Sequence, residues 1–143
     1  METTVEIVYR PDLGTKCDRP LFLVPVAAGF PSPADDYIEQ QLDLNRHLIK
    51  HPAATFFVRV KGDSMIEAGI HSGDILIVDR ALEAVDGKVV IAVIDGELTV
   101  KRVKLRGEKL YLVPENHEFS PTEITPAMDF TVWGVVVYVI HAL

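Results

Sequence analysis

Two residues of this 143-residue chain carry side chains that could together cut a peptide bond. Ser64 follows Gly62-Asp63 at a turn, and Lys101 lies in a strand-like stretch, 97–105. A serine hydroxyl becomes an efficient nucleophile only when a neighbouring base takes its proton. A lysine amine can be that base when it is uncharged, and burial away from counter-charges favours the uncharged form. The pair therefore predicts acyl transfer by a serine–lysine dyad.

Residue types and spacing alone do not select this chemistry. Most serines in Gly-Asp-Ser turns only cap or turn the backbone, and most strand lysines are solvated. Lys88 and Lys104 are alternatives to Lys101, whereas Arg102 is expected to point the other way, into solvent. The histidines are weaker candidates for the base, because none has an obvious orienting carboxylate in the sequence: His47, His51, His71, His117 and His141.

A candidate substrate lies in the same chain, at Val26-Ala27-Ala28-Gly29-Phe30. Small residues on both sides of the Ala28–Gly29 bond would let the backbone approach a shallow site. Gly29 lies 35 residues before Ser64, and an extended connection of that length exceeds ~100 Å. The segment can therefore reach the site of its own subunit or that of a neighbour, and the chain is expected to be a self-processing regulator.

Composition limits the other classes of function. A formal net charge of −7 and a pI of about 5.1 argue against a chain that holds nucleic acid by itself, because phosphate binding needs basic patches. The single cysteine, Cys17, excludes an internal disulfide. No apolar run reaches the ~20 residues of a membrane span, and the acidic N-terminus is unlike a signal peptide. A cytoplasmic protein is the simplest interpretation.

The pattern of elements predicts a mostly-β domain. Residues 1–33 contain five prolines and are expected to form an extended N-terminal arm. Asp43 is expected to cap a short helix that ends before His51-Pro52. Alternating or apolar runs predict strands after Thr55, with a central strand at 88–94 and an Asp95-Gly96 hairpin turn. The predicted strands are 56–61, 74–79, 88–94, 97–105, 109–113 and 130–141.

Several segments, in one order from about Pro20 to the C-terminus, resemble the UmuD family of SOS-mutagenesis proteins, which are related to the self-cleaving domain of the LexA repressor. The resemblance covers about four-fifths of the chain. The segments are Ala28-Gly29-Phe30-Pro31-Ser32-Pro33-Ala34, His51-Pro52-Ala53-Ala54-Thr55-Phe56-Phe57-Val58, Gly62-Asp63-Ser64-Met65-Ile66, Gly73-Asp74-Ile75-Leu76-Ile77-Val78-Asp79 and Asp95-Gly96-Glu97-Leu98-Thr99-Val100-Lys101-Arg102. A further segment resembles the LexA side of the family: Val113-Pro114-Glu115-Asn116-His117-Glu118-Phe119-Ser120-Pro121.

This resemblance implies a fold and a set of roles. The fold is a LexA/UmuD-type, signal-peptidase-like coiled β domain with an extended N-terminal arm and a short helix. Ser64 would be the nucleophile, Lys101 the general base, and the backbone N–H groups of Asp63 and Ser64 the oxyanion hole. The scissile bond would be Ala28–Gly29, where UmuD proteins often have cysteine before the glycine and LexA relatives have alanine.

Cleavage there would divide the chain into an arm, 1–28, and a peptidase and dimerisation domain, 29–143. The arm is too short for the helix-turn-helix domain of a repressor. The resemblance implies that a RecA filament on single-stranded DNA favours cleavage. The trimmed homodimer would then join a UmuC-type Y-family polymerase in translesion synthesis.

A further partner is indicated by only three residues. Pro20-Leu21-Phe22 resembles the arm segment associated with sliding-clamp contact, although these residues could equally pack the arm on the domain. No cofactor, membrane contact or specific DNA site is expected. A metal site is not expected either, because His47 and His51 have i, i+4 spacing but no evident third ligand. The alternatives are a Ser-Lys protease that acts on other proteins and a non-cleaving polymerase-binding module.

Overall fold

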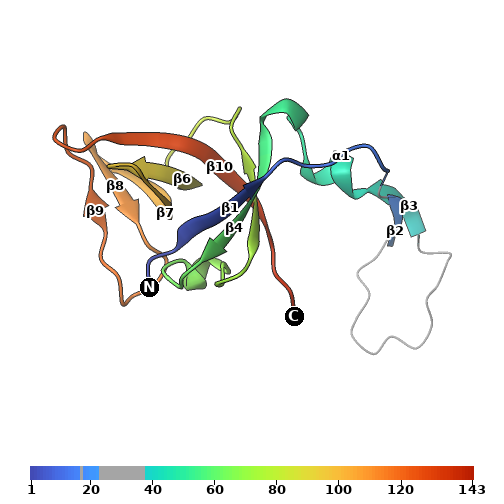
Figure 1. The fold of residues 1–143 in the computed structure, drawn as a ribbon, viewed down its shortest axis with the longest axis horizontal. Helices are drawn as coiled ribbons and strands as arrows, with labels where there is room; N and C mark the ends of the chain where they lie inside the picture. Colours follow the sequence, from blue (N-terminus) through green and yellow to red (C-terminus); the bar gives the residue numbers. More distant parts are fainter. Residues whose placement is uncertain (17, 23–37) are drawn as a thin grey trace. The chain divides into compact units, whose positions relative to one another are not determined.

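The computed structural model describes residues 1–16, 18–22 and 38–143 (Figure 1). These residues form two compact units, one of Met1–Pro11 with His51–Leu143 and one within Asp12–Lys50. Cys17 and the expected cleavage segment, 26–30, lie outside the described residues. In the described ranges no helix is long and apolar enough to cross a membrane.

The larger unit is built on an antiparallel sheet that, over the described residues, has eight strands in the order β1-β4-β5-β10-β6-β7-β8-β9. β1 also pairs with β7, at Thr4↔Thr99, so that the strands from β1 to β7 close into a ring. The strands are β1 (Thr4–Tyr9), β4 (Thr55–Lys61), β5 (Ile75–Asp79), β6 (Val89–Ile94), β7 (Glu97–Arg106), β8 (Lys109–Val113), β9 (Thr122–Glu123) and β10 (Phe130–Ile140).

The predicted central strand is confirmed. β6 lies between β10 and β7, and its residues Val90, Ile91 and Ala92 are fully buried. The turn into β7 has φ +48° at Asp95 and +85° at Gly96, the positive values that a two-residue type I′ hairpin requires. This hairpin sets the register that places Lys101 opposite Val90.

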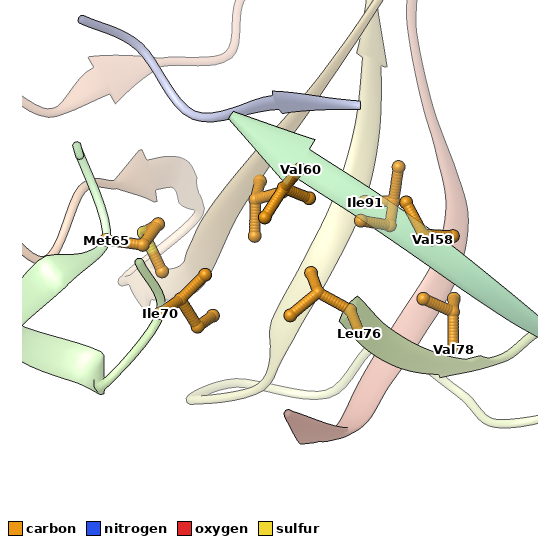
Figure 2. Packing of buried hydrophobic residues seen from close by; sticks show 8 residues of the cluster. Val58, Val60, Met65, Ile70, Leu76, Val78 and Ile91 are labelled. Atoms are coloured by element: carbon orange, nitrogen blue, oxygen red, sulfur yellow. The ribbon is translucent and has the colours of Figure 1, made fainter. Parts of the chain in front are cut away.

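The main hydrophobic cluster lies inside the closed part of the sheet (Figure 2). It joins strand residues to two residues of the segment between β4 and β5, Met65 and Ile70. Met65 is fully buried, which stabilises the fold by about 1.5–3 kcal/mol for a side chain of this kind. Because Met65 follows Ser64 directly, this burial also fixes the backbone beside the candidate nucleophile. Two short 3₁₀ turns, η2 (Pro52–Ala54) and η3 (Ile66–Ala68), flank β4 and the serine turn.

The smaller unit contains β2 (Asp18–Phe22) paired antiparallel with β3 (Ile38–Asp43), followed by α1 (Leu44–Leu48). The predicted cap is confirmed, since the Asp43 carboxylate accepts the backbone N–H of Asn45 at 3.0 Å. The Asn45 side-chain amide donates to the Thr15 carbonyl at 2.8 Å within the same unit.

The mostly-β prediction is confirmed, but the arm is more ordered than the sequence indicates. β1 pairs with β4 from Thr4↔Lys61 to Tyr9↔Phe57 and so adds a strand to the domain. Thr4–Tyr9 is rich in β-branched and aromatic residues, which favour strands. The prolines that follow this strand indicated an extended arm instead.

Candidate active site

Ser64 lies in a tight turn at the end of β4. Gly62 has φ +103°, a conformation that favours glycine, and a Cβ there would meet the Glu2 carbonyl oxygen at 2.1 Å. The buried Asn116 side chain donates to the Asp63 carbonyl at 2.9 Å and holds the turn from the other side. Ser64 is fully buried in this arrangement.

Lys101 projects from β7 toward this turn. Its Nζ lies 3.4 Å from Ser64 Oγ, and it also donates to Thr99 Oγ1 at 3.2 Å and to the Val100 carbonyl at 3.3 Å. The residue is only 5% exposed. The fold thus brings a hydroxyl and an amine 37 residues apart in the sequence to hydrogen-bond distance.

The two alternative lysines lie elsewhere. Lys104 sits on the opposite face of β7, an odd number of residues from Lys101. Lys88 is exposed just before β6. Of the three lysines that the sequence leaves open, Lys101 is the one that the described structure places beside Ser64.

The first three residues of the chain occupy this site. The Thr3 N–H donates to Ser64 Oγ at 2.8 Å, and the Glu2 carboxylate forms an ion pair with Lys101 Nζ. The Met1 carbonyl accepts the Asp63 N–H at 2.9 Å, so one donor expected of the oxyanion hole already holds a carbonyl oxygen. We call residues 1–3 the blocking segment.

Backbone and terminal contacts extend this docking. The Thr3 carbonyl accepts from the Val100 N–H at 3.0 Å and from Thr99 Oγ1 at 3.1 Å. The terminal ammonium of Met1 donates to the Asp63 carboxylate at 2.7 Å, which holds the pKa of Asp63 below its ordinary value. Thr3 is fully buried, yet its hydroxyl has no hydrogen-bond partner in the described structure.

An open cleft of about 510 Å³ leads to the dyad along β7. Ile94, Thr122 and Lys101 contribute to its walls. Its acidic lining residues include Glu2 of the blocking segment and Glu97. The cleft is large enough to take an extended peptide beside Ser64 and Lys101.

Contacts of the charged residues add to what the sequence indicates. In the described structure these histidines lie within hydrogen-bond distance of a carboxylate: His51 with Asp79 at 2.5 Å, His117 with Glu67 at 3.1 Å and His141 with Asp74 at 2.6 Å. The partners escaped notice because they lie 28 to 67 residues away, and none of these carboxylates contacts Ser64. Arg102 lies on the other face of β7 from Lys101, as expected, but its side chain is only 27% exposed: it pairs with Glu115 and donates to the Gly87 carbonyl at 2.6 Å.

The remaining site residues stay predictions. Ala28 and Gly29 lie outside the described residues, so the scissile bond has no described position. Pro20-Leu21-Phe22 lies on β2 of the smaller unit. The blocking segment could not be predicted from local patterns, because its partners, Asp63, Ser64 and Lys101, are all far along the chain.

Comparison with known proteins gives a consistent picture. The family model described as Peptidase S24-like matches residues 20–137. Protein ImpA of Salmonella typhimurium is 52% identical over 124 residues, which cover 86% of this chain and 83% of the relative. Protein MucA of Escherichia coli is 45% identical over 120 residues, 83% and 82% of the two chains.

A LexA repressor is a further relative. LexA repressor 2 of Pseudomonas syringae pv. tomato is 43% identical over 110 residues, which cover 77% of this chain and 54% of the repressor. The family match contains Ser64, Lys101 and the Ala28–Gly29 bond, whereas the blocking segment precedes the matched residues.

Proposed function

The chain belongs to the peptidase S24-like family, and on that premise we propose that it cleaves its own backbone between Ala28 and Gly29. The observation that carries the proposal is the 3.4 Å separation of Lys101 Nζ and Ser64 Oγ in a buried site. Such a pair is the serine–lysine variant of a catalytic triad.

The chemistry needs no group beyond the chain and water. Uncharged Lys101 takes the proton of Ser64 as Oγ attacks the Ala28 carbonyl carbon. The Asp63 and Ser64 backbone N–H groups stabilise the oxyanion. The C–N bond then breaks, and Lys101 returns the proton to the Gly29 amine. Water hydrolyses the resulting ester and releases residues 1–28.

In this proposal the blocking segment keeps the site latent. The Glu2 carboxylate stabilises the charged amine of Lys101, and a charged amine cannot act as the base. The Thr3 N–H occupies a lone pair of Ser64, and the Met1 carbonyl occupies the Asp63 donor. Cleavage therefore requires that residues 1–3 leave and that residues 26–30 enter the cleft as an extended strand.

A partner that binds the unblocked state preferentially would activate cleavage. Following the UmuD resemblance, we assign this role to a RecA filament on single-stranded DNA. The product, 29–143, would act as a homodimer and as an accessory subunit of an error-prone UmuC-type translesion polymerase in the SOS response. Because β1 lies upstream of the cut, processing would leave it held to β4 and β7 by strand pairing alone, and a partner strand could then compete for those edges.

Mass spectrometry tests the proposal. Purified protein is incubated at alkaline pH, or with RecA, single-stranded DNA and a nucleotide at neutral pH. We expect one cut, after Ala28, that is abolished by Ser64→Ala and Lys101→Ala and retained by the matched control Lys104→Ala. The rate without RecA should rise from neutral to alkaline pH, since only an uncharged amine at position 101 can act.

Other results would select a different function. Cleavage of added proteins with an intact arm would indicate a protease that acts on other chains. A chain that stays whole under all conditions would indicate a binding module. A cut that survives Ser64→Ala would contradict the assigned chemistry.

A further inference from the structure

A second cluster of chemically active side chains lies where β5 begins and β10 ends. The strands pair with Ile140 opposite Ile75, so His141 continues the register opposite Asp74. His71 is held three residues before Asp74 by a turn in which the Asp74 N–H donates to the His71 carbonyl at 3.1 Å. The fold thus gathers two imidazoles and one carboxylate from distant parts of the chain.

The donor atoms of this cluster converge. His141 Nδ1 lies 2.6 Å from one Asp74 oxygen, and His71 Nδ1 lies 3.7 Å from the other. The two imidazole rings are 4.5 Å apart between centroids, and one ligand atom from each residue falls within 4.8 Å of the others. The Asp74 side chain is 4% exposed.

One atom of the cluster has no explanation within the protein. His71 Nδ1 is buried and has no hydrogen-bond partner in the described structure. A buried ring nitrogen without a partner is costly, and native proteins usually satisfy such an atom. The nearest carboxylate oxygen, on Asp74, lies 3.7 Å from this nitrogen, beyond hydrogen-bond distance. An ion bound by both imidazoles and Asp74 would instead give every donor a partner.

We propose that His71, Asp74 and His141 bind a divalent transition metal ion, with Zn²⁺ the best match. Two imidazoles and a carboxylate, with water completing a tetrahedron, are ligands that zinc accepts. Ligand atoms around such an ion lie ~3.4 Å apart, given bonds of ~2.1 Å. The imidazole rings are partly exposed, so they can rotate to bring the ligand atoms from their present separations to this spacing.

The surroundings give the carboxylate a fixed direction and the site a structural role. The Asp74 carboxylate accepts the His71 backbone N–H at 2.8 Å, which orients it as outer contacts orient metal ligands. The nearby Arg59 donates to the Gly73 carbonyl at 2.9 Å. Ser72 Oγ accepts the Gly62 N–H at 3.1 Å, so the turn that holds the ion also supports the serine loop. The ion would tie the end of β10 to this turn.

Metal titration of the full chain tests the site. The Ser64→Ala variant keeps the chain whole and makes the test independent of self-cleavage. After chelator treatment it is titrated with Zn²⁺ by calorimetry and with Co²⁺ by absorption spectroscopy. We expect one ion per chain, a Co²⁺ spectrum of low coordination number, and an unfolding midpoint raised by several degrees at saturating Zn²⁺.

Matched variants decide the outcome. His71→Asn and His141→Gln should each weaken Zn²⁺ binding at least tenfold, whereas His117→Gln should leave it unchanged. A His–Asp contact without metal would lower the midpoint of the metal-free variants and leave the response to Zn²⁺ unaltered. That result, or no binding at one ion per chain, would overturn the proposal.

Discussion

The first fifty residues of the chain are divided between the two compact units. Residues 1–11 are part of the larger unit, where β1 pairs with β4 and the blocking segment lies on the dyad. Residues 12–50 form a unit of their own, and the proposed scissile bond falls within that range. In the proposed function the arm is therefore not one functional piece: its beginning, which contacts Ser64 and Lys101, would restrain the site, and its middle would be the substrate.

This division has a consequence for the processed protein. Both the blocking segment and β1 lie before Ala28, so after the proposed cut only non-covalent contacts would hold them to the domain.

The largest effect is expected from Lys101→Arg. A guanidinium stays protonated at any accessible pH, so it cannot take the serine proton, although it can still pair with Glu2. Self-cleavage should fall about 10³-fold or more, as measured by the appearance of 29–143 on gels at alkaline pH. Lys104→Arg is the matched control. Lys101→Met provides a second, uncharged replacement, and circular dichroism checks that each variant folds.

Glu2→Gln tests the blocking segment itself. Loss of the carboxylate removes the partner that stabilises the charged amine of Lys101. RecA-independent cleavage at neutral pH should rise several-fold, because the blocking segment loses the ion pair that holds it on Lys101. Glu6→Gln, on the exposed part of β1, should change nothing. Equal rates for Glu2→Gln and the unaltered protein would show that residues 1–3 do not limit cleavage.

Thr3→Val should have the opposite effect and strengthen the docking of the blocking segment. The buried Thr3 hydroxyl has no partner in the described structure, and valine has nearly the same shape without the polar group. Removing an unsatisfied buried hydroxyl should stabilise the docked segment by about 1 kcal/mol and slow basal cleavage several-fold. Thr4→Val, at the next position, is the control. Faster cleavage by Thr3→Val would contradict the proposed docking.

The sequence predicted the parts of the molecule whose signals are local. The strands at β4, β6 and β8 follow from apolar runs and turn residues, and Asp43 marked the helix start. What it could not predict depends on contacts between distant residues. Nothing near Lys101 in the sequence distinguishes it from Lys104, because the difference is which face of β7 meets Ser64.

The same reason explains the missed features of the N-terminus and the histidines. Thr4–Tyr9 has residues that favour strands, but the edge with which it pairs, β4, lies some fifty residues later in the sequence. His141 acquires Asp74 as a partner through the register of β10 on β5. The proposed cleavage at Ala28–Gly29 lies outside the described residues and stays a prediction.

The smallest expected effect concerns pH and the outer end of the blocking segment. The terminal ammonium lowers the pKa of Asp63, so this contact stabilises docking above the ordinary value of 3.8 and is lost as the pH falls below it. Asp63 is exposed, and solvent limits the contribution. Amide exchange at Thr3 should therefore accelerate modestly as the pH falls through this range, after correction for the intrinsic exchange rate. Asp63→Asn should have the faster exchange at neutral pH and lose part of the pH dependence. An unchanged Thr3 amide in that variant would place the restraint in Glu2 and the backbone alone.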